Sequence, residues 1–565
     1  MLFNSFAYLV FLPIVFLCYW LVFDYAMRRC KRQLLWQNLF VVVASYVFYG
    51  WWDWRFLILI AITTVLSFLS GLGIDKAPSP RAKKAVMLSN VIANLGILGV
   101  YKYYDFFAAQ FADLFGLKAD FLLLHLILPV GISFYTFQAL SYSIDVYRKH
   151  IEPTRDIVAF TAFLSFFPQL VAGPIERATN LLPQFQKRRT FDYTQVVDGM
   201  RQILWGLLKK VVIADNCAPY VDEVFGHLSS YSGSTLLLAT LLFSLQIYGD
   251  FSGYSDIAIG TAKLFGIKLM RNFNMPYFSR DIAEFWRRWH ISLTTWFRDY
   301  VYIPLGGSRP TIPGWLQCKV DSVKCKGTDN EFKGERLKVI GEEAGKADTP
   351  ASTLYTLHHT QTEASTPYTL HPTPKMINRY TKAIAVRNTF IIFLLSGFWH
   401  GANWTFVLWG VYHALLFVPL LLLNQNRRYR DVVATVSSAD SSVIHKRLPS
   451  LKELGQISLT FVLVMMGWAI FRVENLSQLG VYLANLLDPS LWSLPCHLKA
   501  YDGLALPLGL SIVLMGVMEW VNRTREHALA HLPSSRVLRI LIYYLLLVLM
   551  YLYTGYNETF IYFQF

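Results

Sequence analysis

The chain has 565 residues, of which 54% are hydrophobic and only 16% are charged, against about 25% charged residues in an ordinary soluble domain. This composition excludes a disordered chain, a secreted disulfide scaffold and a typical cytosolic enzyme. The net charge of +15 is spread over short loops between apolar runs, which predicts contact with anionic membrane lipid and no nucleic-acid binding. The six cysteines are scattered, so we expect neither a disulfide framework nor a metal site.

Apolar blocks long enough to cross a bilayer recur along the chain, which predicts an all-α, polytopic membrane protein with about ten to twelve transmembrane helices. The first block has no basic leader and no small-residue cleavage site, so we expect a retained span and not a signal peptide. Basic loops such as 24–33, 75–84 and 147–156 are predicted to face the cytoplasm by the positive-inside rule. The blocks lie near 3–23, 34–52, 56–74, 85–104, 121–143, 201–221, 235–258, 387–401, 403–423, 456–471, 504–521 and 538–553.

Two stretches do not fit a simple span. Residues 157–175 are apolar but contain a Gly-Pro pair, and broken backbone is tolerated at membrane depth only where protein or a water-filled cavity surrounds it. We therefore expect a re-entrant segment there. Residues 276–306 mix tryptophans with charges, which is typical of an interfacial helix, and Glu284 precedes Arg288 by four positions, where the two side chains can pair.

Residues 309–378 differ from the rest because they are rich in Lys, Glu, Thr and Pro and contain a short near-repeat. This pattern predicts a cytoplasmic, largely disordered insertion. Its histidines and cysteines lack metal-ligand spacing. We therefore divide the chain into a membrane core at 1–308, the insertion at 309–378, and the rest of the membrane core at 379–565.

The strongest chemical signal is His400, which stands between two apolar blocks. The apolar run before it, 389–399, would form a helix only about 16 Å long, whereas the hydrocarbon core is about 30 Å thick. His400 is therefore expected within the membrane, where an ionisable side chain indicates function. Gly397 and Gly401 leave room for another group beside the imidazole. The alternative is a structural histidine that is hydrogen-bonded between packed helices.

Two further polar features lie earlier in the chain. His290 follows two tryptophans and is either functional or an anchor at the membrane interface. The segment 246–256 places two carboxylates, several hydroxyls and two glycines inside an apolar block, so it cannot face lipid. It either lines a cavity or pairs internally, for which the arginines of 280–298 are candidates.

These motifs together resemble the membrane-bound O-acyltransferase family, and most closely its alginate O-acetyltransferase branch. The resemblance covers 1–308 and 379–480, whereas the rest of the C-terminal part matches mainly in hydropathy. The insertion departs from the family pattern. The segments that carry the resemblance are 164–175, 250–256, 287–290, 297–300, 302–307 and 397–402.

The resemblance implies that the chain is a membrane enzyme with His400 as the catalytic base and His290 in a supporting role. Histidine suits this task because its unperturbed pKa is about 6.5, and a covalent acyl-histidine is the variant mechanism. No bound cofactor is implied, and acetyl-CoA or an acyl-carrier donor supplies the acyl group from the cytoplasm. The residues expected to line the central cavity are Gly173, Pro174, Asp250, Ser252, Tyr254, Asp256, Arg288, Trp399 and Asn403.

The acceptor implied by the resemblance is an exported or cell-envelope polysaccharide, with an extracytoplasmic acetyltransferase as partner and the bacterial inner membrane as location. One alternative is transfer of D-alanine from a carrier protein to teichoic acid, although the sequence of residues 246–307 more closely resembles the acetyl branch. The other is a proton-coupled transporter, which often shows internal repeats of its transmembrane unit. We find no such repeat in the sequence.

Overall fold

The computed structural model describes residues 1–118, 120, 122–171, 173–307, 374–429, 448–496, 503–554 and 561. These residues form helices and connecting loops, with no strand in the described ranges. The predicted all-α, membrane-embedded fold is thus confirmed. The predicted insertion at 309–378 lies outside the described residues, apart from 374–378, which begin a long helix.

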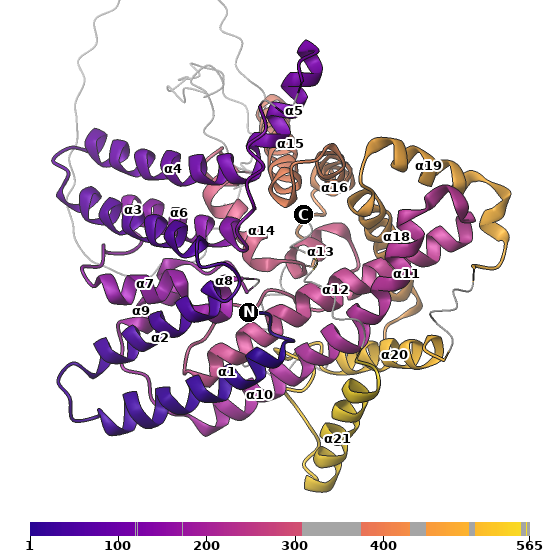
Figure 1. Cartoon of the computed structure of the whole chain (residues 1–565). Helices are drawn as coiled ribbons and strands as arrows, with labels where there is room; N and C mark the ends of the chain where they lie inside the picture. Colours follow the sequence, from indigo (N-terminus) through magenta and orange to yellow (C-terminus); the bar gives the residue numbers. More distant parts are fainter. Residues whose placement is uncertain are drawn as a thin grey trace, which may run out of the picture.

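The helices fall into three groups along the chain (Figure 1). The first group is α1 (Phe6–Leu17), η1 (Cys18–Ala26), α2 (Gln33–Gly50), α3 (Phe56–Lys76), α4 (Pro80–Lys102), α5 (Tyr104–Phe115), α6 (Ile132–Tyr147), α7 (Ile157–Ser165), α8 (Phe167–Leu170) and α9 (Ala178–Phe185). The second is α10 (Tyr193–Leu207), η3 (Leu208–Ala214), α11 (Asp215–Gly226), η4 (Leu228–Ser230), α12 (Gly233–Leu264), η5 (Pro276–Phe278), α13 (Ile282–Arg288), α14 (Ile291–Phe297) and η6 (Arg298–Tyr302). The third is α15 (Pro374–His400), α16 (Trp404–Leu422), α18 (Leu451–Arg472), α19 (Leu476–Leu487), η9 (Pro489–Trp492), α20 (Ala505–Val521) and α21 (Arg536–Leu552).

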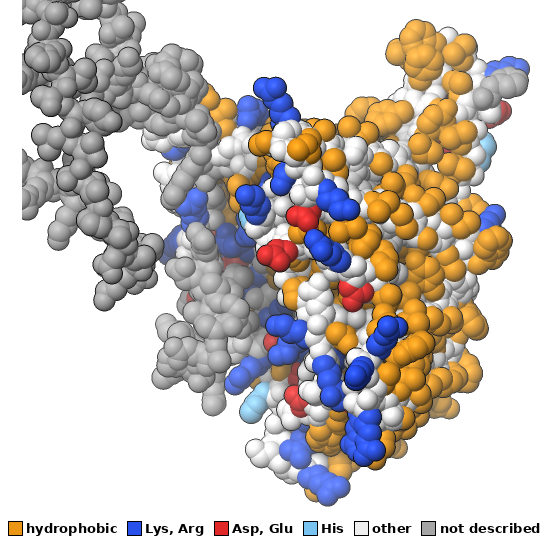
Figure 2. Space-filling view, turned by 90° about the vertical axis from the view of Figure 1, so that its left-hand side faces the viewer, with side chains coloured by type: hydrophobic (Ala, Val, Ile, Leu, Met, Phe, Trp, Pro, Cys, Tyr) orange, Lys and Arg blue, Asp and Glu red, His pale blue; other side chains and the backbone are white. Residues whose placement is uncertain are grey.

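Seven of the described helices are long and apolar enough to cross a membrane. Many of their large apolar side chains are exposed, which a lipid environment tolerates and water does not. Figure 2 shows one face of the molecule. Apolar side chains cover the right-hand part of this face, and lysine and arginine side chains gather to their left. The surface thus has the division expected of a protein embedded in a bilayer. The spans are Phe6–Ala26, Phe56–Lys76, Pro80–Lys102, Gly233–Leu264, Asn378–His400, Trp404–Leu422 and Leu451–Arg472.

The centre of the molecule is the long helix α12, which packs against α10 and α11 (Figure 1). The approach of α10 is close because glycines face the partner helix on both sides. A Cβ on Gly206 would meet the backbone oxygen of Gly253, and a Cβ on Gly260 would meet that of Gly199. Small residues at such crossings allow two membrane helices to pack backbone to backbone.

The two irregular stretches surround this centre. The predicted break in 157–175 is confirmed, because α7 ends at Ser165 and the four-residue α8 follows. The stretch 276–306 forms η5, α13, α14 and η6 in place of one interfacial helix. Most side chains of α13 are buried. Trp286 in this helix and Trp289 directly after it pack inward, with ring centroids 5.5 Å from Trp409 and 4.8 Å from Trp468, respectively.

Candidate active site

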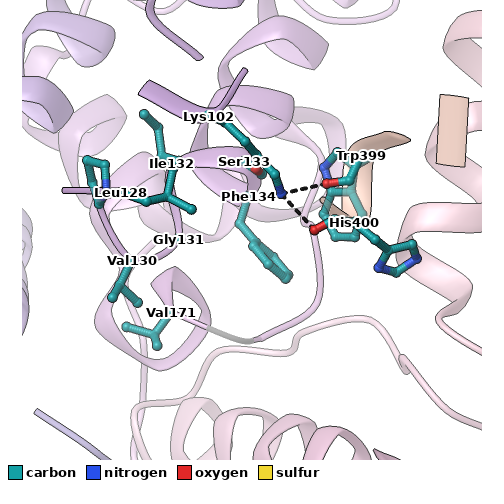
Figure 3. Close-up of a pocket in the computed structure, with 11 residues that line it drawn as sticks. Lys102, Leu128, Val130, Gly131, Ile132, Ser133, Phe134, Val171, Trp399 and His400 are labelled. Atoms are coloured by element: carbon teal, nitrogen blue, oxygen red, sulfur yellow. Dashed lines mark hydrogen bonds between the residues drawn. The ribbon is translucent and has the colours of Figure 1, made fainter. Parts of the chain in front are cut away.

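A cavity of about 70 Å³ lies between the first and third groups of helices. The loop 128–131 and the first turn of α6, residues 132–134, form one wall, and Trp399 and His400 at the end of α15 form another (Figure 3). Lys102, the last residue of α4, and Val171 complete the lining. Segments far apart in the sequence thus meet at a single site that contains His400.

His400 is the last residue of α15, and its side chain is buried among aromatic rings. Its ring centroid lies 4.9 Å from Trp399, 5.1 Å from Trp409 and 5.2 Å from Phe471. The Nζ atom of Lys102 donates to the backbone oxygens of Trp399, at 2.6 Å, and of His400, at 3.0 Å (Figure 3). Carbonyls at a helix C-terminus lack partners in the helix and attract a cation, so Lys102 fixes the end of α15.

His290 lies directly before α14 and has a backbone φ of +44°, which is uncommon for a residue other than glycine. Its Nδ1 lies 3.1 Å from Oδ1 of Asn272. That oxygen also accepts from Ser292 Oγ at 2.8 Å, while the Asn272 amide nitrogen donates to Ser255 Oγ at 3.0 Å. Asn272 Oδ1 is therefore an acceptor, so His290 carries its proton on Nδ1 and leaves Nε2 as a proton acceptor.

The structure brings the two predicted histidines to the same tryptophan. The Trp399 ring centroid lies 5.8 Å from that of His290 and 4.9 Å from that of His400. Phe134, which lines the cavity, lies 5.6 Å from Trp399 and 6.4 Å from His290. Among the described side chains, no group hydrogen-bonds to Nε2 of His290. This nitrogen is thus available to a ligand that reaches it.

Arg288 contacts a carboxylate and does not belong to the lining of this cavity. Its Nη2 lies 2.8 Å from Oε1 of Glu284, which confirms the pairing predicted from their spacing. Arg280 donates from Nε to the other Glu284 oxygen at 3.0 Å. Glu284 is fully buried, so the two guanidinium groups stabilise its charge. This network holds α13 and with it the backbone that leads to His290.

The polar segment of α12 pairs internally. Asp250 lies 2.8 Å from Nζ of Lys210, and Asp256 lies 2.6 Å from Nζ of Lys209, which also donates to Ser252 at 2.8 Å. The partners are thus two successive lysines of the π-helix η3 and not the arginines of 280–298. The sequence did not indicate this pairing, because the lysines lie inside an apolar block. These carboxylates do not belong to the lining of the His400 cavity.

The other predicted lining residues have packing or capping contacts. Asn403 caps α16, because its side chain accepts a backbone N–H of the first turn. Tyr254 is buried in α12. A Cβ on Gly173 would overlap the backbone of Gln169, so the bend before Pro174 requires glycine at this position. Of the nine predicted lining residues, only Trp399 belongs to the lining of the cavity that contains His400.

Two residues near the site were not predicted. Lys102 stands at the end of an apolar block, where a lysine ordinarily indicates only the membrane boundary. His413 lies on α16, fully buried, with its ring centroid 4.8 Å from Trp409 and 5.0 Å from Trp286. Neither ring nitrogen of His413 has a hydrogen-bond partner in the part of the chain that the structure describes. A single histidine in an apolar run gives no periodic signal from which such a position is predicted.

A charged cluster lies at the far end of α14. Asp299 accepts from Arg298 at 2.6 Å and from Arg177 at 2.5 Å. Burial opposes the charge of Asp299, but the guanidinium groups of Arg298 and Arg177 lower the pKa of this carboxyl below its ordinary value. Arg148 and Arg177 both lie 5.6 Å from the ring centroid of Tyr300. The cluster therefore carries more positive than negative charge.

A row of aromatic rings joins this cluster to the cavity. The ring centroids of Tyr300 and Trp296 are 5.1 Å apart, and Trp296 stacks on Phe137 at 4.1 Å. Phe137 lies 6.0 Å from Trp399. Three rings thus connect the arginines near Asp299 with Trp399, the tryptophan that both histidines contact.

Comparison with known proteins gives consistent results. Residues 148–316 match the family model of the membrane-bound O-acyltransferases (MBOAT). The chain is 36% identical to the probable alginate O-acetylase AlgI of Pseudomonas aeruginosa over 78% of its length and 68% of that protein. It is 31% identical to the peptidoglycan O-acetyltransferase of Helicobacter pylori over 88% of its length and 82% of that protein. It is 24% identical to the teichoic acid D-alanyltransferase of Bacillus subtilis over 54% of its length and 62% of that protein.

Proposed function

The chain belongs to the membrane-bound O-acyltransferase family and is a multi-pass O-acyltransferase of the bacterial inner membrane, and on this premise we propose that it transfers acetyl groups from cytoplasmic acetyl-CoA to an exported or cell-envelope polysaccharide. The observation that carries the proposal is the meeting of His290 and His400 at Trp399, beside a cavity. Imidazole is the side chain best suited to accept a hydroxyl proton near neutral pH.

The identity of the acyl group and acceptor is inferred from the relatives. The relatives that cover more than three quarters of this chain are acetylases of alginate and of peptidoglycan. The D-alanyltransferases of Bacillus subtilis and Streptococcus thermophilus match 54% and 60% of the chain at 24% and 25% identity, so acetyl transfer is favoured over D-alanyl transfer. The relatives are acyltransferases, which leaves the transporter alternative without support.

The proposed reaction needs two proton transfers, one from the acceptor hydroxyl and one to the leaving thiolate. The acceptor hydroxyl oxygen forms a bond to the thioester carbonyl carbon, the carbon–sulfur bond breaks, and the hydroxyl proton passes through an imidazole to the leaving thiolate. His400 is the proposed base, and the unprotonated Nε2 of His290 supports it. In the variant mechanism an imidazole nitrogen first takes the acetyl group and then gives it to the acceptor.

The arginine cluster near Asp299 supports a donor that carries phosphates. Guanidinium groups match the geometry of phosphate oxygens, and Arg148 belongs to the loop 147–156, which is predicted to face the cytoplasm. The aromatic row from Tyr300 to Trp399 gives the donor an apolar route toward the histidines. The acetyl group leaves on the opposite side, to the glycan itself or to an extracytoplasmic acetyltransferase.

The test is histidine substitution with the wild-type amount of protein in the membrane. We expect His400→Ala to lower glycan acetylation at least 100-fold and His290→Ala to lower it less, because loss of a general base costs about 10²–10⁴-fold. His227→Ala is the matched control, since His227 is exposed in the loop after α11. Acetyl and alanyl esters on the isolated glycan are separated by mass spectrometry. Normal acetylation in the His400→Ala strain would overturn the proposal.

A further inference from the structure

Lys102 and the end of α15 form a contact that the acyl-transfer chemistry alone does not require. Nζ of Lys102 donates to the last two carbonyls of α15, at 2.6 Å to Trp399 and 3.0 Å to His400 (Figure 3). The same side chain lines the cavity beside His400. Lys102 therefore holds the backbone of the proposed base and faces the space that a ligand would occupy.

The charge of Lys102 differs from that of the other lysines inside the protein. Lys209, Lys210 and Lys263 each have a carboxylate oxygen near Nζ, at 2.6, 2.7 and 2.5 Å. Lys102 forms no ion pair with any described carboxylate, and its contacts are the two carbonyls and the Trp399 ring, whose centroid lies 5.8 Å away. Lys102 is half-buried, and a cation that is partly removed from water is costly without a counter-charge, so this site favours an anionic ligand.

The number of donors leads to the same conclusion. An ammonium group has three N–H bonds, and two of those of Lys102 are used by the helix carbonyls. One N–H is left for a ligand.

Lys102 also ends α4, whose other end, at Pro80, adjoins the loop 75–84 that is predicted to be cytoplasmic. The cavity thus lies at the side from which an exported acceptor would arrive.

We propose that Lys102 is a positioning residue for His400 and that its remaining N–H and its charge bind a negatively charged oxygen in this cavity. Two sources supply that oxygen: the carboxylate of an acidic sugar in the acceptor, or the oxyanion that develops on the thioester carbonyl. The proposal rests on the proposed function because it assigns Lys102 to the same reaction. It adds a ligand preference that a structural lysine would not produce.

The test compares Lys102→Met, Lys102→Gln and Lys102→Arg in the purified, full-length protein. Acetyl transfer from acetyl-CoA is measured with an oligouronate and with a neutral oligosaccharide of equal length, together with hydrolysis of acetyl-CoA by water. We expect Lys102→Met to lower kcat/KM about 10- to 100-fold, which is the effect of losing a hydrogen bond to a charged group. Lys102→Arg retains the charge and both helix contacts, so we expect it to recover most of the activity.

The pattern of loss identifies the source of the oxygen. If the acceptor carboxylate binds Lys102, Lys102→Met loses activity with the oligouronate and retains it with the neutral sugar. If the oxyanion binds Lys102, kcat falls by the same factor with both sugars and with water. Lys102→Gln keeps a donor without charge, so it separates the hydrogen bond from the electrostatic effect if Lys102→Met does not fold.

Lys382→Met is the matched control. Lys382 donates from Nζ to the carbonyl of Leu422 at the end of α16, at 2.9 Å, but it is not part of the cavity lining. We expect its loss to change thermal stability and leave the sugar preference unchanged. Equal rates and equal sugar preference in wild type and Lys102→Met would overturn the inference while the proposed function stands.

A binding measurement separates this failure from failure of the proposed function. If the acceptor carboxylate binds Lys102, the oligouronate is expected to raise the unfolding temperature of the wild type more than that of Lys102→Met, whichever acyl donor the enzyme uses. If the wild type transfers acetyl and the two shifts are equal, the acceptor carboxylate is excluded, and the comparison of kcat with both sugars and with water decides whether the oxyanion binds Lys102. If the wild type does not transfer acetyl from acetyl-CoA, the proposed donor is wrong. The inference then stands if the shifts differ and fails if they are equal.

Discussion

The Nδ1 atom of His290 lies 3.1 Å from Oδ1 of Asn272, and this contact determines which nitrogen of the ring can accept a proton. Asn272 cannot rotate freely, because its amide nitrogen donates to Ser255 and its oxygen accepts from Ser292. An amide held on both sides fixes the histidine tautomer, as second-shell groups do at other imidazole sites. The base character of His290 is thus set by a residue 18 positions away in the chain.

We predict that Asn272→Ala lowers kcat about 3- to 10-fold, because the variant loses a hydrogen bond of about 1 kcal/mol and no longer fixes the tautomer. Asn272→Asp is expected to act differently. A carboxylate beside His290 favours the imidazolium and raises its pKa, so the acidic limb of the kcat/KM profile should move to higher pH. Stopped assays of acetyl transfer between pH 5.5 and 8.5 measure both effects.

The control for these variants is Asn38→Ala. Asn38 is also buried, and it donates to the carbonyl of Phe185 at 2.8 Å, away from the cavity. We expect this variant to lose stability and to keep the wild-type pH profile. A profile for Asn272→Asp that coincides with that of the wild type would show that Asn272 does not act through the imidazole.

A second prediction concerns the crossing of α15 and α16. A Cβ on Gly397 would overlap the backbone oxygen of Phe406, and a Cβ on Gly410 would overlap that of Phe393. We expect Gly397→Ala to separate the helices, to cost about 1–3 kcal/mol, and to lower activity per folded molecule because His400 lies one turn further on. Scanning fluorimetry in detergent and acetyl transfer measure the two effects.

Gly455→Ala in α18 is the matched control for this crossing, since a Cβ at that position meets no other atom within 4 Å. Removal of a helical glycine there should stabilise the protein by about 0.5–1 kcal/mol. If Gly397→Ala were as stable and active as Gly455→Ala, the close crossing would not be needed to position His400.

These contacts indicate what could be predicted from the sequence. Apolar blocks predicted the spanning helices because hydropathy is a local property, and the motifs around His290 and His400 led to a resemblance that the relatives confirm. The sequence did not predict that Lys102 meets His400, because the two are 298 positions apart. Lys210 and His413 were also missed, since an isolated lysine pair or a single histidine inside an apolar run does not indicate its partner on another helix.

A third prediction concerns the ion pairs inside the membrane core. Lys210 lies between two buried carboxylates, 2.7 Å from Asp215 and 2.8 Å from Asp250. Lys210→Met leaves both carboxylates without their cation, which should cost about 3–5 kcal/mol. The double variant Lys210→Met/Asp250→Asn removes one of the two charges and should recover part of that loss. Unfolding of the four proteins of this cycle in detergent gives the coupling energy, and simple additivity would contradict the arrangement.

The last prediction is a pH dependence of stability that arises from Glu176, a buried carboxyl outside the spanning helices. Its oxygens accept from Asn180 Nδ2 at 2.7 Å and from the backbone N–H of Met270. Burial raises the pKa of Glu176 from 4.5 to about 7. The folded protein therefore binds a proton more tightly than the unfolded chain does. The associated stability is fully present below pH 4.5 and is lost as the pH rises to about 7.

Glu176→Gln removes this titration and is expected to flatten the pH dependence. Between pH 4.5 and 7 the wild type should lose on the order of 3 kcal/mol relative to the variant, which is the linkage for a shift of this size. Glu152→Gln, at an exposed position, serves as the control and should follow the wild type. The unfolding temperature of the three proteins is measured in one detergent from pH 4.5 to 8. A wild-type protein whose stability relative to Glu176→Gln does not fall over this interval would show that Glu176 is ionised in the folded state well below pH 7.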